Sequence, residues 1–192
     1  MTTETDSQTR TQSLPDGSNV TIRPMQADDL EAMVSFARAL PQEDLLFLRV
    51  DLTDPKVAKQ VMLNQSSDSG FVATDDQGII GYAVVHRNST NRHRHLGEIR
   101  VNVSADYRSR GLGRVLINQA FDKAASLNLK KLTAHMTSDQ RGAQAAFRKL
   151  GFVPEAHLAD YVIDRAGNTR DMIIMSFDLE GHTDQAFGSV SL

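Results

Sequence analysis

The pattern of apolar and polar positions predicts a chain that mixes short strands with amphipathic helices. Val20–Arg23 alternates apolar and polar residues as a half-buried strand does, and Pro24 ends it by removing a backbone donor. Apolar residues then recur at helical spacing over Asp28–Ala37, behind acids that favour a helix N-terminus. Further helical segments are expected within Glu43–Leu48 and after Asp54-Pro55, where an N-cap residue precedes a proline at the first helical position.

A group of strands occupies the middle of the chain. Phe71–Thr74 and Ile79–Val85 flank Asp75–Gly78, whose composition is that of a hairpin turn, so these two strands should pair antiparallel. Glu98–Val103 alternates strictly and predicts another strand.

The remaining elements continue the mixture of strands and helices. An amphipathic helix is expected over Val115–Leu127, and a second helix, capped by Ser138 or Asp139, should end at Gly151, which suits a left-handed C-terminal residue. The expected strands of this part are Lys131–Met136, His157–Ile163 and Met172–Phe177. This order predicts a mixed α/β fold with helices on a single sheet of six to seven strands, and disfavours a doubly wound nucleotide fold.

Length and composition narrow the class of protein. With 192 residues and 40% hydrophobic content, the chain can bury one sizeable core. We therefore expect one domain over residues 19–180, with flexible tails at 1–18 and 181–192. A net charge of −3 argues against general nucleic-acid binding, and the lack of cysteine excludes disulfides and thiolate chemistry. With no signal peptide or membrane span in the pattern, a cytoplasmic protein is expected.

A turn rich in glycine and arginine follows the strand that ends at Val103. Its sequence is Arg108-Ser109-Arg110-Gly111-Leu112-Gly113, with Arg114 directly after it. We call Arg108–Gly113 the glycine turn. Glycines let backbone amides approach phosphate oxygens, the helix start adds unpaired N–H groups, and the arginines add charge. The turn thus favours a di- or polyphosphate ligand, although an ordinary helix entry with solvated arginines has the same composition. Its spacing fits neither the P-loop nor the dinucleotide fingerprint.

The surroundings of this turn resemble the signature of the GNAT acetyltransferase superfamily. The resemblance rests on Val101–Val103, on Tyr107–Gly113 with the helix and strand after it, and on Ala146–Phe152. It implies a largely antiparallel sheet splayed between the strands at Glu98–Val103 and Lys131–Met136, and acetyl-CoA as co-substrate. The residues that it assigns to the cofactor are Val101, Asn102, Val103, Arg108, Ser109, Arg110, Gly111, Leu112, Gly113, Arg114, Gln140 and Phe147.

Acetyl transfer to an amine requires a group that removes a proton, because amines are mostly protonated near neutrality. Glu98 is the first candidate, since its register before the glycine turn is similar to that of the glutamate in bacterial protein-lysine acetyltransferases. A carboxylate merely paired with Arg100 is the alternative. His135 is the second candidate because histidine titrates in the useful range, although a lone histidine in a strand is more often a packed, satisfied side chain.

Two positions depart from the family pattern. The tyrosine that usually protonates the departing thiolate is Phe147 here, which has no proton to give. Tyr161 or Tyr107 can substitute, or the thiol can leave as thiolate. The usual asparagine at the start of that helix is Gln140, which keeps an amide on a longer stem.

A basic segment is the last candidate for chemistry. It contains His86, Arg87, Arg92, His93, Arg94 and His95, which invite a metal or nucleic-acid interpretation. Because the histidines lack ligand spacing and no carboxylate joins them, we expect no metal and a solvated loop that can steer CoA phosphates.

The function implied is N-acetyl transfer from acetyl-CoA to a primary amine by direct attack in a ternary complex. The acceptor is either a small-molecule amine or amino acid, or a protein lysine. A CoA-binding module without catalysis is the alternative from another class. No nucleic-acid or membrane partner is expected, and a homodimer is left open.

Overall fold

The computed structural model describes residues 9–45, 48, 50–64, 70–87, 92–164 and 166–180. The expected C-terminal tail and the first eight residues of the expected N-terminal tail lie outside the described residues. Residues 46 and 47 of the expected helical segment and residues 88–91 of the basic segment also lie outside them.

The described residues form eight strands and a set of helices whose order follows the predicted one. The first part contains β1 (Arg10–Ser13), β2 (Asn19–Pro24), the short 3-10 helix η2 (Ala27–Asp29), α1 (Leu30–Ala39), α2 (Gln42–Leu45), α3 (Pro55–Asn64), β3 (Gly70–Asp75) and β4 (Gly78–Arg87). The second part contains β5 (Leu96–Val103), the 3-10 helix η3 (Ala105–Tyr107), α4 (Leu112–Ser126), β6 (Lys131–Thr137), α5 (Arg141–Lys149), β7 (Val153–Ile163) and β8 (Thr169–Asp178).

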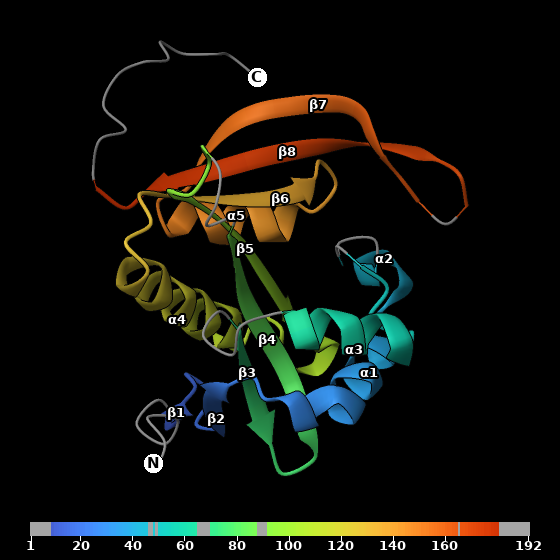
Figure 1. Cartoon of the computed structure of the whole chain (residues 1–192), viewed down its shortest axis with the longest axis vertical. Coiled ribbons are helices and arrows are strands. Elements are labelled where there is room, and N and C mark those ends of the chain that lie inside the picture. Colours follow the sequence, from blue (N-terminus) through green and yellow to red (C-terminus); the bar gives the residue numbers. More distant parts are fainter. Residues whose placement is uncertain are drawn as a thin grey trace. The chain divides into compact units, whose positions relative to one another are not determined.

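The strands are hydrogen-bonded in the order β1-β2-β3-β4-β5-β6-β8-β7 (Figure 1). Neighbours pair antiparallel at β1–β2, β2–β3, β3–β4, β6–β8 and β7–β8, whereas β5 and β6 pair in parallel. The predicted mixed α/β class is confirmed. The parallel pairing joins only Leu96–Glu98 to Lys131–Thr133, which is the short contact that a splayed pair of strands requires.

The sheet has eight strands because β1 extends it beyond the predicted six to seven. Its sequence Arg-Thr-Gln-Ser carries no apolar residue, and its side chains are mostly exposed, so hydrophobic alternation could not reveal it. Arg10 faces Ile22 and Ser13 faces Asn19 in an antiparallel pair with β2. The folded part of the chain therefore begins before Asn19, which the apolar pattern alone had placed at its start.

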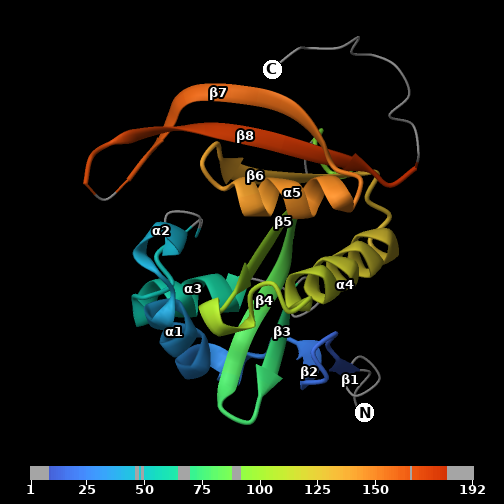
Figure 2. The same cartoon turned by 180° about the vertical axis from the view of Figure 1, so that it is seen from behind.

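The chain divides into two compact units, one of residues up to His86 with Ile99–Lys123 and one of Arg87–Glu98 with the residues from Ala124 onward. In the first unit, α1 and α3 lie side by side (Figure 2) and share a core with β3 and β4. The rings of Phe36 and Tyr82 meet edge to face within this core, with centroids 5.9 Å apart. The predicted helices at α1 and α3 bury their apolar stripes here.

In the second unit, α5 lies against the sheet of β6, β8 and β7 (Figure 2). Phe147 of α5 meets Phe152 edge to face at 4.9 Å between ring centroids, and Phe152 in turn packs on Phe177 of β8 at 5.6 Å. Gly151 has φ +93°, which confirms the predicted left-handed residue after the helix. The predicted cap was wrong, because Gln140 is the N-cap and Asp139 turns its carboxylate to other partners.

No helix among the described residues combines the length and the apolar character needed to cross a membrane.

Candidate active site

The glycine turn has the backbone of an anion cradle. It begins after β5 and η3 and runs directly into α4, whose first amides have no acceptor within the helix. Ser109 has φ +59° and Gly111 has φ +93°, so two nearby residues adopt the left-handed conformation. Left-handed residues of this kind turn successive N–H groups toward a common centre. The turn can therefore offer several backbone donors to one phosphate group.

Gly111 is also required by a close contact with the N-terminal hairpin. A Cβ at this position would lie 2.9 Å from Cδ and 3.1 Å from Cγ of Pro15, closer than carbon atoms normally approach. Pro15 belongs to the turn between β1 and β2, which the hydrogen bond from Leu14 N to Ser18 O closes at 2.8 Å. This hairpin turn supports the glycine turn from one side.

The arginines of the glycine turn are held by carboxylates from distant parts of the sequence. Arg108 forms an ion pair with Asp44 of α2, and Arg110 forms one with Asp16. The guanidinium of Arg110 also stacks over the ring of Tyr107, 4.2 Å from its centroid. Hydrogen bonds from Ser18, and then from Arg110, lower the pKa of Asp16 to about 2. Asp16 and Asp44 carry no local sequence signal, and sequence interpretation missed both.

Tyr107 is fixed by a third acid. Its hydroxyl donates a hydrogen bond of 2.7 Å to Asp75 in the β3–β4 turn, and this bond raises the pKa of Tyr107. A phenol that donates to a carboxylate is held in its protonated form. Asp75 therefore fixes the orientation of the Tyr107 ring, over which Arg110 stacks.

One side chain of the strand before the turn has a structural role. Val101, Asn102 and Val103 are half-buried on β5. The amide nitrogen of Asn102 donates a 2.9 Å hydrogen bond to the hydroxyl of Tyr82, whose pKa burial raises to about 12. The Leu112 side chain is fully buried, so only its backbone can reach a ligand, whereas Arg114 is exposed on α4.

The two candidate bases lie together in the second unit. Glu98 of β5 is the strand partner of Thr133, and His135 lies two residues further on the same face of β6. Oε1 of Glu98 is 3.8 Å from Nδ1 of His135, and their side chains are 20% and 26% exposed. This distance is too long for a hydrogen bond but within reach of an ion pair. Glu98 and His135, the two candidate bases predicted from the sequence, thus form one carboxylate–imidazole pair.

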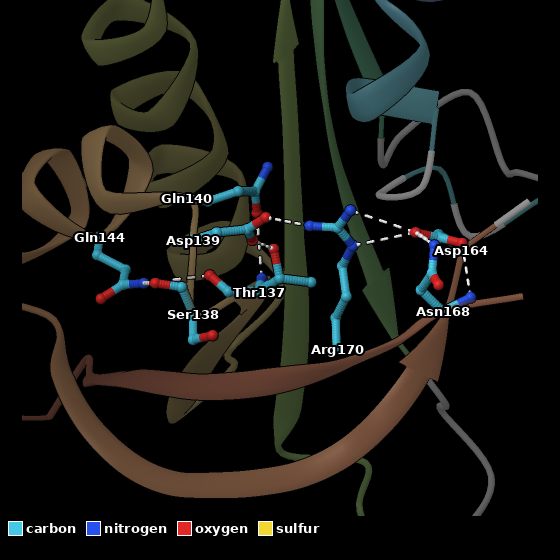
Figure 3. A network of polar contacts seen from close by, with 8 residues as sticks. All are labelled: Thr137, Ser138, Asp139, Gln140, Gln144, Asp164, Asn168 and Arg170. Atoms are coloured by element: carbon cyan, nitrogen blue, oxygen red, sulfur yellow. Dashed lines mark hydrogen bonds and ion pairs between the residues drawn. The ribbon is translucent and has the colours of Figure 1, made fainter. Parts of the chain in front are cut away.

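A polar network fixes the segment that leads into α5 (Figure 3). Arg170 of β8 donates to Asp139 at 2.6 Å and to Asp164 at 3.2 Å. Gln140 Oε1 accepts from the backbone N–H of Thr137 at 3.3 Å, which leaves the amide nitrogen of Gln140 pointing away from this network (Figure 3). Among the described residues, the amide nitrogen of Gln140 thus has no hydrogen-bond partner, while its backbone N–H is held by Thr137 O.

The two remaining aromatic candidates lie in different surroundings. Phe147 is buried against Phe152, as a core residue is. Tyr161 is 62% exposed on the edge strand β7, and no hydrogen bond joins it to the described residues. The structure does not bring Tyr161 into contact with Glu98 or His135. Among the described residues, no group of three or more His, Asp or Glu side chains is arranged to hold a metal ion.

Known proteins with sequence or structural similarity include enzymes with different acceptors. A spermidine N(1)-acetyltransferase of Vibrio cholerae is 26% identical over 117 residues, which are 59% of this chain and 66%, just under two thirds, of the relative. A proposed acetyltransferase of Salmonella typhimurium, solved with its cofactor acetyl-CoA, shares 20% identity and a TM-score of 0.73, over 85% of this chain and 96% of that one. A ribosomal-protein-alanine N-acetyltransferase of Brucella melitensis shares 23% identity and a TM-score of 0.70, over 82% and 98%.

The two solved structures establish the fold alone, because their sequence identity is low. The sequence pattern of the acetyltransferase (GNAT) family matches residues 33–152. This segment contains the glycine turn, Glu98, His135 and Phe147, and it spans more than half of the chain. The chain belongs to the acetyltransferase (GNAT) family.

Proposed function

We propose that this protein is an acetyl-CoA-dependent N-acetyltransferase that acetylates a small-molecule primary amine. The observation that carries the proposal is the glycine turn at the start of α4, within the segment that matches the family. The acetyl-CoA in the Salmonella relative and the spermidine acetylation named for the Vibrio relative support the cofactor and the acceptor class.

In this proposal the first unit holds the CoA moiety. The amides of the glycine turn and the side chains of Arg108, Arg110 and Arg114 bind the pyrophosphate. Because Arg108 and Arg110 already contact Asp44 and Asp16, the phosphates must compete with these carboxylates. The backbone of Val101–Val103 binds the pantetheine arm and the thioester.

The pair of Glu98 and His135 removes the proton of the amine. The carboxylate of Glu98 beside the imidazole of His135 stabilises an imidazolium, so His135 can accept the proton while Glu98 supports the positive charge; alternatively, Glu98 accepts the proton itself. The amine nitrogen then attacks the thioester carbon, the new C–N bond forms, and the C–S bond breaks. Backbone amides near Val101–Val103 stabilise the oxyanion. The CoA thiolate leaves, and the remaining proton that the attacking nitrogen must lose passes through water to the sulfur, since Phe147 has none to give.

The test compares Glu98→Gln and His135→Asn with Glu155→Gln, which removes a carboxylate of the same unit that is paired with Lys131. Each active-site variant should lower kcat about 10²–10⁴-fold, because general base catalysis contributes that factor. The dissociation constant for acetyl-CoA should stay within about twofold of wild type. Release of free thiol with spermidine and a panel of amines measures turnover. In the variants its pH profile should lose the limb at low pH on which turnover rises as the base is deprotonated.

Three results would contradict parts of the proposal. Wild-type turnover in Glu98→Gln and His135→Asn would remove the base assignment. Acetylation of lysine peptides without any small amine would replace the acceptor class. A protein that binds acetyl-CoA but consumes it with no amine would be a binding module.

A further inference from the structure

A concave basic pocket lies in the second unit, formed by residues that the proposed reaction does not use. Its volume is about 610 Å³. It is lined by Arg87 at the end of β4, by Arg92, Arg94 and His95 before β5, and by Asn128 and Lys130 between α4 and β6. We call these six residues the basic pocket. Three separate segments of the chain thus bring cationic side chains to one concavity.

Backbone hydrogen bonds fix two of these segments against each other. The carbonyl of His95 accepts from the N–H groups of Lys130 at 2.8 Å and Lys131 at 3.3 Å. Asn128 adopts φ +54°, a conformation that asparagine tolerates better than most residues. The carbonyl of Lys130 accepts from Leu179 at 2.8 Å. The cations are therefore presented by an ordered backbone, which reduces the ordering cost of binding.

The charges of the pocket are largely uncompensated. Arg87, Arg92 and Arg94 form no ion pair with the described residues. Lys130 has one acidic partner, Glu180, at 3.2 Å, and both side chains are about half exposed. Like charges at one site repel each other, and the chain as a whole carries a net charge of −3. The pocket is thus a local positive region in an acidic protein.

The side chains that line the basic pocket indicate which kind of anion it would bind. Guanidinium groups form paired hydrogen bonds with phosphate oxygens, and Lys130 adds a point charge. The lining contains no Phe, Tyr or Trp, so it lacks the large aromatic platforms on which single-stranded nucleic acids stack their bases. We propose that the basic pocket is a second anion site that binds a small ligand with several phosphate charges.

Such phosphates can come from two sources. One is the 3′-phosphate and pyrophosphate of CoA, and the other is a free polyphosphate. The chemistry is the same, and affinity for CoA, dephospho-CoA and inorganic tripolyphosphate separates the sources.

The experiment uses calorimetric titration of the full chain with inorganic tripolyphosphate at low ionic strength. Arg108→Gln with Arg110→Gln removes two cations of the glycine turn, so that a further loss caused by pocket substitutions in this background reports the basic pocket. Adding Arg92→Gln and Arg94→Gln should weaken tripolyphosphate binding by at least about tenfold, because hydrogen bonds between charged groups are lost. The matched control is Lys56→Gln with Lys59→Gln, which removes two exposed charges from α3.

The outcomes assign or overturn the site. If tripolyphosphate affinity falls no more in the Arg92 and Arg94 variant than in the Lys56 and Lys59 control, the binding is non-specific attraction and the proposal is wrong. Weaker CoA binding with unchanged dephospho-CoA binding, measured in the otherwise wild-type chain, supports the site and identifies the 3′-phosphate as its ligand. Weaker tripolyphosphate binding with unchanged CoA binding supports it and identifies a free polyphosphate. Unfolding temperatures of all variants verify that the chain still folds.

Discussion

The glycine turn and the basic pocket both contain several arginines, but they differ in whether these arginines form ion pairs with carboxylates. Arg108 and Arg110 of the turn each contact a carboxylate, Asp44 and Asp16. Arg87, Arg92 and Arg94 of the pocket contact none among the described residues. The turn adds left-handed backbone at Ser109 and Gly111, whereas the pocket relies on side chains alone for its cations.

The ion pairs of the turn orient its guanidinium groups, whereas the guanidinium groups of the pocket are available to an external anion. A paired guanidinium is held in place, but its ligand must compete with the carboxylate. An unpaired guanidinium is available to any anion, but it repels its cationic neighbours and is screened by salt. Selective, directional binding is therefore expected at the turn, and strongly salt-dependent binding at the pocket.

The largest expected effect comes from the backbone of the turn. Gly111→Ala would place a Cβ 2.9 Å from Cδ of Pro15 in a residue with φ +93°. We expect it to lower the free energy of unfolding by about 1–3 kcal/mol, because a side chain at a left-handed position is strained. Acetyl-CoA binding should weaken in the same variant. Denaturant unfolding and titration with acetyl-CoA measure the two effects.

Gly113→Ala is the matched control for the unfolding measurement. Its added Cβ would meet only Cγ2 of Val103, at an ordinary 3.8 Å, so the stability of the ligand-free protein should change little. Equal destabilisation by the two alanines would show that the positive φ of Gly111 is not what the turn depends on.

A smaller effect is expected from the carboxylate that competes for Arg110. Asp16→Asn keeps an oxygen that can accept the 3.0 Å hydrogen bond from Ser18 N but removes the negative charge beside Arg110. Acetyl-CoA should bind about two- to fivefold more tightly, because a repulsive charge near the phosphates is gone. Arg110→Gln should change the affinity in the opposite direction. Weaker binding in Asp16→Asn would mean that orientation of Arg110 outweighs competition.

Unfolding should depend on pH through the same carboxylate, that of Asp16. Hydrogen bonds from Ser18 and Arg110 lower the pKa of Asp16 from 3.8 to about 2. A lowered pKa means that the folded state binds the proton less tightly than the unfolded state. The stabilisation is therefore complete above about pH 4 and is lost as the pH falls toward about 2. Asp16→Asn should remove this part of the acid sensitivity in pH-dependent unfolding curves.

Local periodicity was enough to predict most elements, because each buries an apolar face that the sequence displays. Leu116, Ala120 and Ala124 of α4 are all completely buried at the predicted spacing. Strand β1 was not predicted, because Arg10–Ser13 contains no apolar residue.

Partners in the site were harder to predict than the residues themselves. Glu98 and His135 could each be proposed from its own strand, but their proximity follows from the parallel register of β5 and β6. Asp44 and Asp16 lie 64 and 94 positions from the arginines they contact, so only the fold reveals these pairs. The N-cap of α5 was misassigned because Asp139, a better cap by residue type, is engaged by Arg170.

The smallest expected effect is on the stability of the ligand-free protein, and its sign distinguishes the two regions. Arg92→Gln with Arg94→Gln removes charges that lie beside other cations and form no ion pair with the described residues, so the unfolding temperature should rise by about 1 °C at low salt. Arg110→Gln removes an attractive partner of Asp16 and should lower it. In about 1 M salt the Debye length falls to about 3 Å, and both shifts should shrink toward zero. Shifts of the same sign at low salt would mean that the pocket arginines are stabilised within the chain, which would remove the reason for an external anion.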